Sequence, residues 1–221
     1  MNLLLKAFAK FILGLLIASA LLFIPAGSLN YLNAWLFIGL LFVPILIVGI
    51  VLFIKSPELL KKRLNNKEKE NTQKFVVIFS GLLLILGFII AGLDFRFSWS
   101  KIPTWITIIG SVILLVSYVL YAEVLRENAY LSRTVEIQKD QKVIDSGLYG
   151  IVRHPMYAAT LWLFLAIPIV LGSWYSLICF FPYIAILFVR IRNEEKVLED
   201  GLDGYAEYKK RVKYRIIPFI W

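Results

Sequence analysis

The chain has 221 residues, of which 60% are apolar and 18% are charged, and its formal net charge at pH 7 is +9. Soluble domains carry about 45–50% apolar and about 25% charged residues, so this composition excludes an ordinary soluble enzyme. The single cysteine, Cys179, excludes a disulfide framework and a cysteine metal site, and we expect no metal. The composition therefore indicates an integral membrane protein.

Six apolar segments follow one another along the chain. Segments 34–54, 75–93 and 103–122 have the length of about 20 residues that a helix needs to cross a hydrocarbon core of about 30 Å. The first segment, 11–24, is shorter and spans only if it recruits residues 3–9, with Lys6 and Lys10 reaching the interface. A secretory signal peptide is the alternative for this segment.

The last two apolar segments, 157–171 and 174–189, are separated by Gly172-Ser173, a turn-forming pair that predicts a tight helical hairpin. The charged run 61–70 is typical of a solvated loop. We therefore predict an all-α, polytopic membrane bundle of about six hydrophobic helices with a cytoplasmic C-terminal helix. Residues 1–125 form its four-span membrane region, and residues 126–221 form its candidate catalytic region.

The basic residues are distributed very unevenly between the two sides of this bundle. With a cytoplasmic N-terminus, 22 of the 24 lysines and arginines fall inside, and only Arg96 and Lys101 fall outside. Because cytoplasmic loops retain basic residues during insertion, both termini and the candidate active site are expected in the cytoplasm. The positive net charge then indicates contact with anionic membrane lipids, and no segment resembles a nucleic-acid-binding module.

Polar residues return in the segment 123–157, directly before the hairpin. His154 is the only histidine of the chain, and by itself it is more often structural than functional. Pro155 excludes His154 from the helix and begins the next one, so the end of that helix, with Arg153, can attract an anion. Two partners for Arg153 remain open here, a ligand anion and a phospholipid headgroup.

A second polar cluster begins where the hairpin ends. The spacing of four places Arg190 and Glu194 on one helical face, where they can pair or share a ligand. An apolar and aromatic stripe continues that face and is more often packing than a cofactor site. Gly201 and Gly204 can interrupt its helical register. The stripe consists of Val197, Gly201, Tyr205, Tyr208 and Val212.

Four motifs together resemble the isoprenylcysteine carboxyl methyltransferase family, membrane enzymes that use S-adenosylmethionine. The resemblance covers about residues 128–221, and the earlier spans resemble the family only in being hydrophobic. Order and spacing make the set specific, although each motif alone is weak. The motifs are Ser146-Gly147-Leu148-Tyr149, Arg153-His154-Pro155-Met156-Tyr157, Arg190 with Glu194-Glu195, and residues 205–212 ahead of Pro218.

The resemblance implies which residues contact the cofactor and the methyl acceptor. It places Arg190 at the acceptor, and a further polar residue falls near Glu136. Where relatives carry His-Thr-Leu-Val, this chain has Gln141-Lys142-Val143-Ile144, so backbone groups are expected to make those contacts. The implied cofactor-binding residues are Gln141, Lys142, Val143, Ile144, Tyr149, His154, Pro155, Met156, Tyr157 and Glu194.

The chemistry expected of such a site is methyl transfer from S-adenosylmethionine to a lipid-like or prenylated acceptor. Glu194 would hold the cofactor's ammonium group, and His154 would meet its carboxylate. A carboxylate acceptor needs no general base, because it is already ionised near neutral pH. An amine acceptor, as in phospholipid N-methylation, would use Glu194 or Glu195 as the base.

Two other function classes remain open at the level of the sequence. Some sterol reductases that use NADPH have a comparable C-terminal hairpin, although this chain is short for them and lacks an extended basic site for a 2′-phosphate. A non-enzymatic membrane protein, whose polar segment only anchors lipid headgroups, is the third possibility. The sequence indicates neither the acceptor nor the oligomeric state.

Overall fold

The computed structural model describes residues 3–64, 71–131, 135 and 137–221, and all regular secondary structure within these ranges is helical. The order of helices confirms the predicted all-α membrane fold. The helices are α1 Leu3–Ala26, α2 Leu32–Lys55, α3 Pro57–Leu64, α4 Asn71–Phe97, α5 Thr104–Glu127, the 3₁₀ helix η1 Gly147–Gly150, α6 Pro155–Leu171, α7 Trp174–Phe180, α8 Pro182–Gly201 and α9 Tyr205–Arg211.

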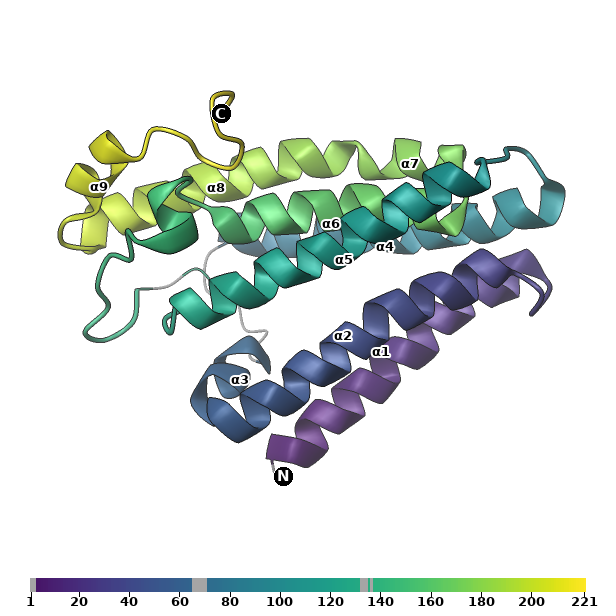
Figure 1. Cartoon of the computed structure of the whole chain (residues 1–221), viewed down its shortest axis with the longest axis horizontal. Helices are drawn as coiled ribbons and strands as arrows, with labels where there is room; N and C mark the ends of the chain where they lie inside the picture. The colour runs from purple at the N-terminus through teal and green to yellow at the C-terminus, as the bar shows by residue number, and fades with distance from the viewer. Residues whose placement is uncertain (1–2, 65–70, 132–134, 136) are drawn as a thin grey trace.

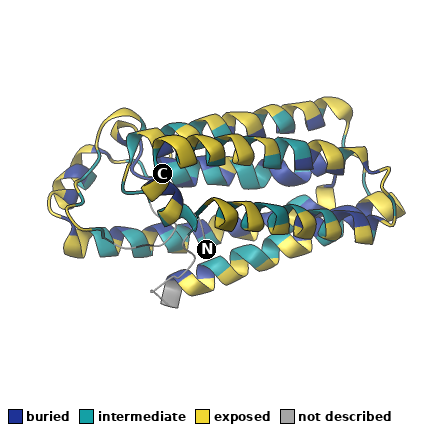
Figure 2. Ribbon diagram, turned by 90° about the horizontal axis from the view of Figure 1, so that it is seen from below, coloured by how far each residue is buried: buried dark blue, intermediate teal, exposed yellow. Residues whose placement is uncertain are grey.

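The long helices run side by side in one bundle (Figure 1). Five stretches among the described residues are long and apolar enough to cross a membrane, and α6 is a shorter apolar helix beside them. Their outward faces are exposed although they are apolar (Figure 2), for example at Leu13, Ile78 and Ile108. Because a soluble monomer rarely exposes such continuous apolar surface, these faces are suited to lipid, and the chain is an integral membrane protein.

The first apolar segment extends to Leu3 at its N-terminal side, as a membrane span requires. Helix α1 packs against α4 and contributes Ala18 and the fully buried Leu22 to the main core. The same core draws residues from α2, α5, α6 and α7. This packing favours a membrane span over a signal peptide for α1.

The predicted hairpin is present, but its second arm differs from the expectation. Gly172 ends α6 with φ +79°, a left-handed conformation that glycine adopts without a Cβ penalty, and Ser173 caps α7 by accepting from the Ser176 backbone. The second arm then breaks at Phe181 and Pro182, because proline lacks the N–H that a continuous helix would use. Helix α8 continues to Gly201, beyond the apolar run that ends at residue 189, so the helical face predicted for Arg190 and Glu194 is present.

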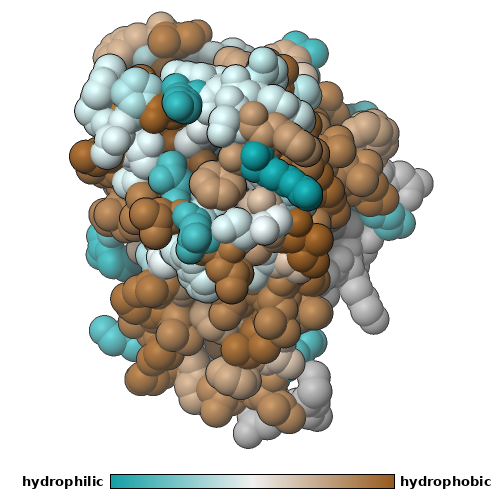
Figure 3. All heavy atoms as spheres, turned by 90° about the vertical axis from the view of Figure 1, so that its right-hand side faces the viewer, coloured by the Kyte–Doolittle hydropathy of each residue, from teal (hydrophilic) through white to brown (hydrophobic). Residues whose placement is uncertain are grey.

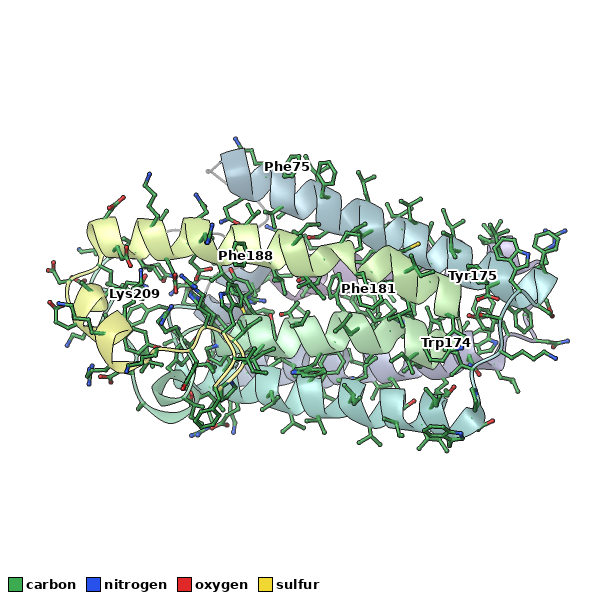
Figure 4. The ribbon with its side chains drawn as sticks, turned by 90° about the horizontal axis from the view of Figure 1, so that it is seen from above. Phe75, Trp174, Tyr175, Phe181, Phe188 and Lys209 are labelled. Atoms are coloured by element: carbon green, nitrogen blue, oxygen red, sulfur yellow. The ribbon has the colours of Figure 1, made fainter. Side chains whose placement is uncertain are left out.

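The two ends of the bundle differ in chemistry. Helices α3 and α9 and the segment leading into η1 lie at one end, and the α1–α2 and α4–α5 connections lie at the other (Figure 1). Lys209 and the pair Trp174 and Tyr175 mark these opposite ends in Figure 4. Figure 3 views the second end, where polar residues are surrounded by apolar side chains. Trp99, Trp105 and Trp174 are partly exposed there, as in an interfacial aromatic belt.

Candidate functional site

The segment before η1 is fixed to the end of α5 by a carboxylate. Glu127 accepts a hydrogen bond from the Leu148 backbone, with 3.0 Å between N and Oε2. Gly147 lies against this carboxylate with φ +56°, and a Cβ at Gly147 would collide with it. Glycine suits this position, because it adopts the left-handed backbone conformation without strain and leaves room for the Glu127 carboxylate.

Tyr149 joins this segment to α9. Its hydroxyl accepts from the Asn128 amide at 2.9 Å, and its carbonyl accepts from the Tyr208 hydroxyl at 2.8 Å. Arg211 of α9 pairs with Asp145 at 2.6 Å. Burial raises the pKa of Tyr149 to about 12, although the Asn128 hydrogen bond opposes the shift, so the phenol stays protonated.

The Arg153-His154-Pro155 motif has the predicted backbone. His154 precedes α6 with φ −127° and ψ 62°, and Pro155 is the first helical residue. The C-terminal segment lies against the motif, because the Arg153 and His154 amides donate to the carbonyls of Tyr214 and Arg215 at 2.9 and 2.8 Å. These hydrogen bonds fix the N-terminus of α6 to the C-terminal segment of the chain.

Glu195 lies at the centre of a buried ionic cluster. It is only 3% exposed, and Arg153 Nε and Arg215 Nε each donate to one of its oxygens, at 2.8 and 3.0 Å. His154 Nε2 lies 3.3 Å from the same carboxylate. Arg153 also donates to the carbonyls of Val212 and Lys213.

Arg153 is thus buried against protein groups and is not directed to lipid headgroups. Its partner Glu195 is surrounded by cations and is not available as a general base.

Arg190 and Glu194 meet through a third residue that the helical spacing did not predict. The Tyr157 hydroxyl of α6 accepts from Arg190 Nε at 2.8 Å and donates to Glu194 Oε2. The guanidinium of Arg190 also lies over the Tyr157 ring, 5.6 Å from its centroid. Tyr157 therefore fixes the positions of both predicted functional residues of α8.

A pocket between the α5–η1 segment, α6, α8 and α9, which we call the polar pocket, collects most of the predicted site. Pro155 is the exception, because it is buried at the start of α6 and does not face the pocket. Glu136 lies outside the described residues. The predicted cofactor-binding residues that line the polar pocket are Gln141, Lys142, Val143, Ile144, Tyr149, His154, Met156, Tyr157 and Glu194, and Arg190 lines it too.

The sequence predicted that the aromatic stripe serves packing. In the structure the stripe has a second role as well. Tyr205, Tyr208 and Val212 form a small core with Leu202, as expected. Tyr205 and Tyr208 also line the polar pocket. The Tyr205 hydroxyl is buried and has no hydrogen-bond partner within the part of the chain that the structure describes. Burial raises the pKa of Tyr205, so its hydroxyl stays protonated and can donate a hydrogen bond into the pocket.

A second cavity adjoins the polar pocket inside the bundle, and we call it the membrane cavity. It has a volume of ≈ 440 Å³ and lies between α4, α5, α6 and α8, with apolar walls such as Leu84, Leu163 and Phe164. Met156, Tyr157 and Arg190 line both spaces. A polar site and an apolar cavity therefore share a wall that contains the predicted acceptor residue.

Residues 106–200 match the model of the isoprenylcysteine carboxyl methyltransferase family. This region is similar to that family. It contains α6, α7, nearly all of α5 and α8, and every predicted site residue. The family resemblance predicted from the motifs is thus confirmed.

Two of the proteins that are similar to this chain bear on its fold and function. The structure of the eukaryotic intramembrane Ras methyltransferase of the isoprenylcysteine carboxyl methyltransferase family matches with a TM-score of 0.59 and 19% identity, over 97% of this chain and 77% of that chain. A Delta(14)-sterol reductase of Mus musculus is 34% identical over 91 residues, which are 40% of this chain and 22% of the reductase. The structural match shows a shared fold, and the sequence match is confined to a fraction of the reductase.

Proposed function

We propose that this chain is an integral membrane methyltransferase that transfers a methyl group from S-adenosylmethionine to a carboxylate of a lipid-like or prenylated acceptor. The observation that carries the proposal is the shared wall between the polar pocket and the membrane cavity. A water-soluble cofactor and a lipid acceptor could meet there without either entering the other's environment. The family match of residues 106–200 supports the same activity.

The donors and walls of the polar pocket fit the cofactor chemically. Glu194 can accept from an ammonium group, Val143, Val197 and Leu198 offer apolar contact to an adenine, and the buried Tyr205 hydroxyl lacks an acceptor that a ligand carboxylate or ribose would supply. Because His154 contacts Glu195, Tyr205 is a better donor to a cofactor carboxylate than the sequence suggested. The pocket has a volume of ≈ 100 Å³, below the range of about 300–1,000 Å³ that ligand pockets have, so cofactor binding requires its lining to rearrange.

Arg190 would orient the acceptor carboxylate from the shared wall. Bound S-adenosylmethionine supplies an electrophilic methyl group on a positively charged sulfur. A guanidinium recognises a carboxylate through two parallel N–H groups, and Tyr157 holds this one in place. The apolar walls of the membrane cavity exclude water from the carboxylate, and alignment of the two reactants supplies the rate acceleration. We place the termini and the polar pocket on the cytoplasmic side, where the basic residues gather.

The sterol reductase match favours one alternative, an NADPH-dependent reductase. Of the lysines and arginines that line the polar pocket, Arg153 is bound to Glu195 and Arg190 to Tyr157, which leaves Lys142 for a 2′-phosphate. This is a weak phosphate site compared with an arginine cluster. Phospholipid N-methylation is the other alternative within the methyltransferases.

Calorimetric titration of the detergent-solubilised protein separates the two cofactors. We expect S-adenosylhomocysteine to bind, NADPH not to bind, and Glu194→Ala to abolish binding. Arg190→Gln should retain binding and lose turnover, because Arg190 faces the acceptor. Binding of NADPH alone to folded protein would favour the reductase over the methyltransferase. If neither ligand gives a heat of binding, both enzyme hypotheses are rejected.

A further inference from the structure

A third cavity lies between α2, α3 and α5, and we call it the α2–α5 groove. It has a volume of ≈ 880 Å³ and shares no lining residue with the polar pocket or the membrane cavity. Ile47 and Val51 are exposed although they are apolar, so the groove opens toward the lipid-facing side of the bundle. Its apolar wall contains Ile47, Val48, Val51, Leu52, Ala122 and Leu125.

The groove lies in the part of the bundle that ends at α3. Tyr118 of α5 donates to the Leu41 carbonyl of α2 at 3.2 Å, which joins the two helices above the groove. The groove residues of both helices follow these two positions, and both helices run toward the α3 end (Figure 1). From Ile47 to Lys55, eight residues at 1.5 Å each give α2 a wall about 12 Å long.

Basic side chains gather where the groove reaches the α3 end. Lys55 is the last residue of α2, Lys62 lies on α3, and Arg126 lies in the last turn of α5. Arg126 is bound to Glu123, with 2.8 Å between Nε and Oε2. Lys62 donates to the Ala129 carbonyl at 3.4 Å. Among the described residues, no acidic side chain forms an ion pair with either lysine.

The composition of the groove matches that of a membrane lipid with an acidic headgroup. Glu58 also lines it, so three basic residues and one acidic residue give its lining a formal charge of +2. Acyl chains suit the apolar wall, and basic pockets between membrane helices attract anionic headgroups. A neutral lipid, such as a sterol, would fill the wall but leave Lys55 and Lys62 without an anion.

We infer that the α2–α5 groove binds a phospholipid with a net negative headgroup. Its acyl chains lie along the apolar wall, and its phosphate lies between Lys55 and Lys62. The inference does not depend on the proposed methyl transfer, because the groove is separate from both cavities of that reaction. It gives the N-terminal half of the chain a lipid site of its own.

Native mass spectrometry of the detergent-solubilised protein tests the inference without requiring turnover. The probes are phosphatidylglycerol and phosphatidylcholine with identical acyl chains, added in equal amounts. The wild type should retain phosphatidylglycerol at least about tenfold more often, since each basic residue near a headgroup contributes about a fivefold preference. Lys62→Gln should lower that ratio about fivefold, and Lys55→Gln combined with Lys62→Gln should bring it close to one.

Lys61→Gln is the matched control, because Lys61 is exposed on the same helix, does not line the groove and carries the same charge. It should leave the ratio as in the wild type. Val51→Trp tests the apolar wall, because an indole there fills part of the groove. It should lower the retention of both lipids.

Equal retention of the two lipids by the wild type would overturn the inference. So would an unchanged ratio in the double variant, an equal loss in Lys61→Gln, or full lipid retention by Val51→Trp. A protein dimer that Val51→Trp separates would show that a second copy of the chain covers the groove, which also overturns the inference.

Discussion

The Tyr205 hydroxyl is buried beside the polar pocket and lacks a partner within the described ranges of the chain. Removing an unsatisfied hydroxyl costs the empty protein little, whereas a bound ligand would lose one hydrogen bond worth about 1 kcal/mol. Tyr205→Phe should therefore leave the unfolding temperature unchanged or raised and weaken S-adenosylhomocysteine binding about fivefold. Calorimetry and thermal unfolding measure the two effects.

The control for this variant is Tyr214→Phe, which changes a phenol on the C-terminal segment outside the polar pocket. It should alter neither quantity. If Tyr205→Phe has a lower unfolding temperature and an unchanged ligand affinity, the hydroxyl has a structural role only.

Glu195 neutralises two buried or half-buried arginines at the base of the same pocket. Breaking a buried ion pair from one side leaves the remaining charge uncompensated and costs about 3–5 kcal/mol. Glu195→Gln should therefore lower the unfolding temperature sharply in detergent. Glu199→Gln, four residues later and paired with Lys209 at the surface, should change stability by about 1 kcal/mol or less. Equal stability of the two variants would contradict the role of the cluster.

At the scale of single residues, the sequence predicted the local backbone of the site better than it predicted which side chains contact one another. The His154-Pro155 pair sets its own backbone, so the start of α6 was predictable from local sterics. The partner of Arg153 was not, because Glu195 lies 42 residues away and is brought close only by the hairpin. Tyr157 was assigned to the cofactor, but its bridging of Arg190 and Glu194 depends on the packing of α6 against α8.

At the scale of elements, Gly147 holds the α5–η1 segment against the end of α5. A methyl group there would meet the Glu127 carboxylate and would also strain a backbone with φ +56°. Gly147→Ala should displace the segment, and we expect a loss of S-adenosylhomocysteine affinity of about five- to thirtyfold, as a distortion of about 1–2 kcal/mol would give. Calorimetric titration measures this loss of affinity.

Gly39→Ala is a suitable comparison, because a Cβ at Gly39 in α2 meets nothing within 4 Å. This substitution should preserve ligand affinity. If Gly147→Ala also binds normally, the segment does not shape the pocket.

The apolar segments predicted the existence of the membrane helices but not all of their limits. Helix length and apolar composition are local properties, so α2, α4 and α5 matched their predicted segments closely. The break between α7 and α8 was missed, because the apolar run 174–189 continues through Phe181 and Pro182. The division at residues 125 and 126 stays a prediction, since α5 and α6 pack together across it.

At the scale of the whole molecule, the distribution of charge leads us to expect a defined orientation in the membrane. Lys101 and Lys210 are exposed at opposite ends of the bundle, and Cys179 is the only natural thiol. In a Cys179→Ala background, Lys101→Cys should react with a membrane-impermeant maleimide on intact cells. Lys210→Cys should react only after permeabilisation, and the reverse pattern would invert the topology.

The central claim is methyl transfer from S-adenosylmethionine to a lipid carboxylate. Its most direct measurement incubates the reconstituted protein with methyl-labelled S-adenosylmethionine and N-acetyl-S-farnesylcysteine and follows the label in the lipid extract. We expect label that alkali releases as methanol, as a methyl ester requires, and none with Glu194→Ala. Absence of label from folded wild-type protein, or label that resists alkali, would contradict transfer to a carboxylate.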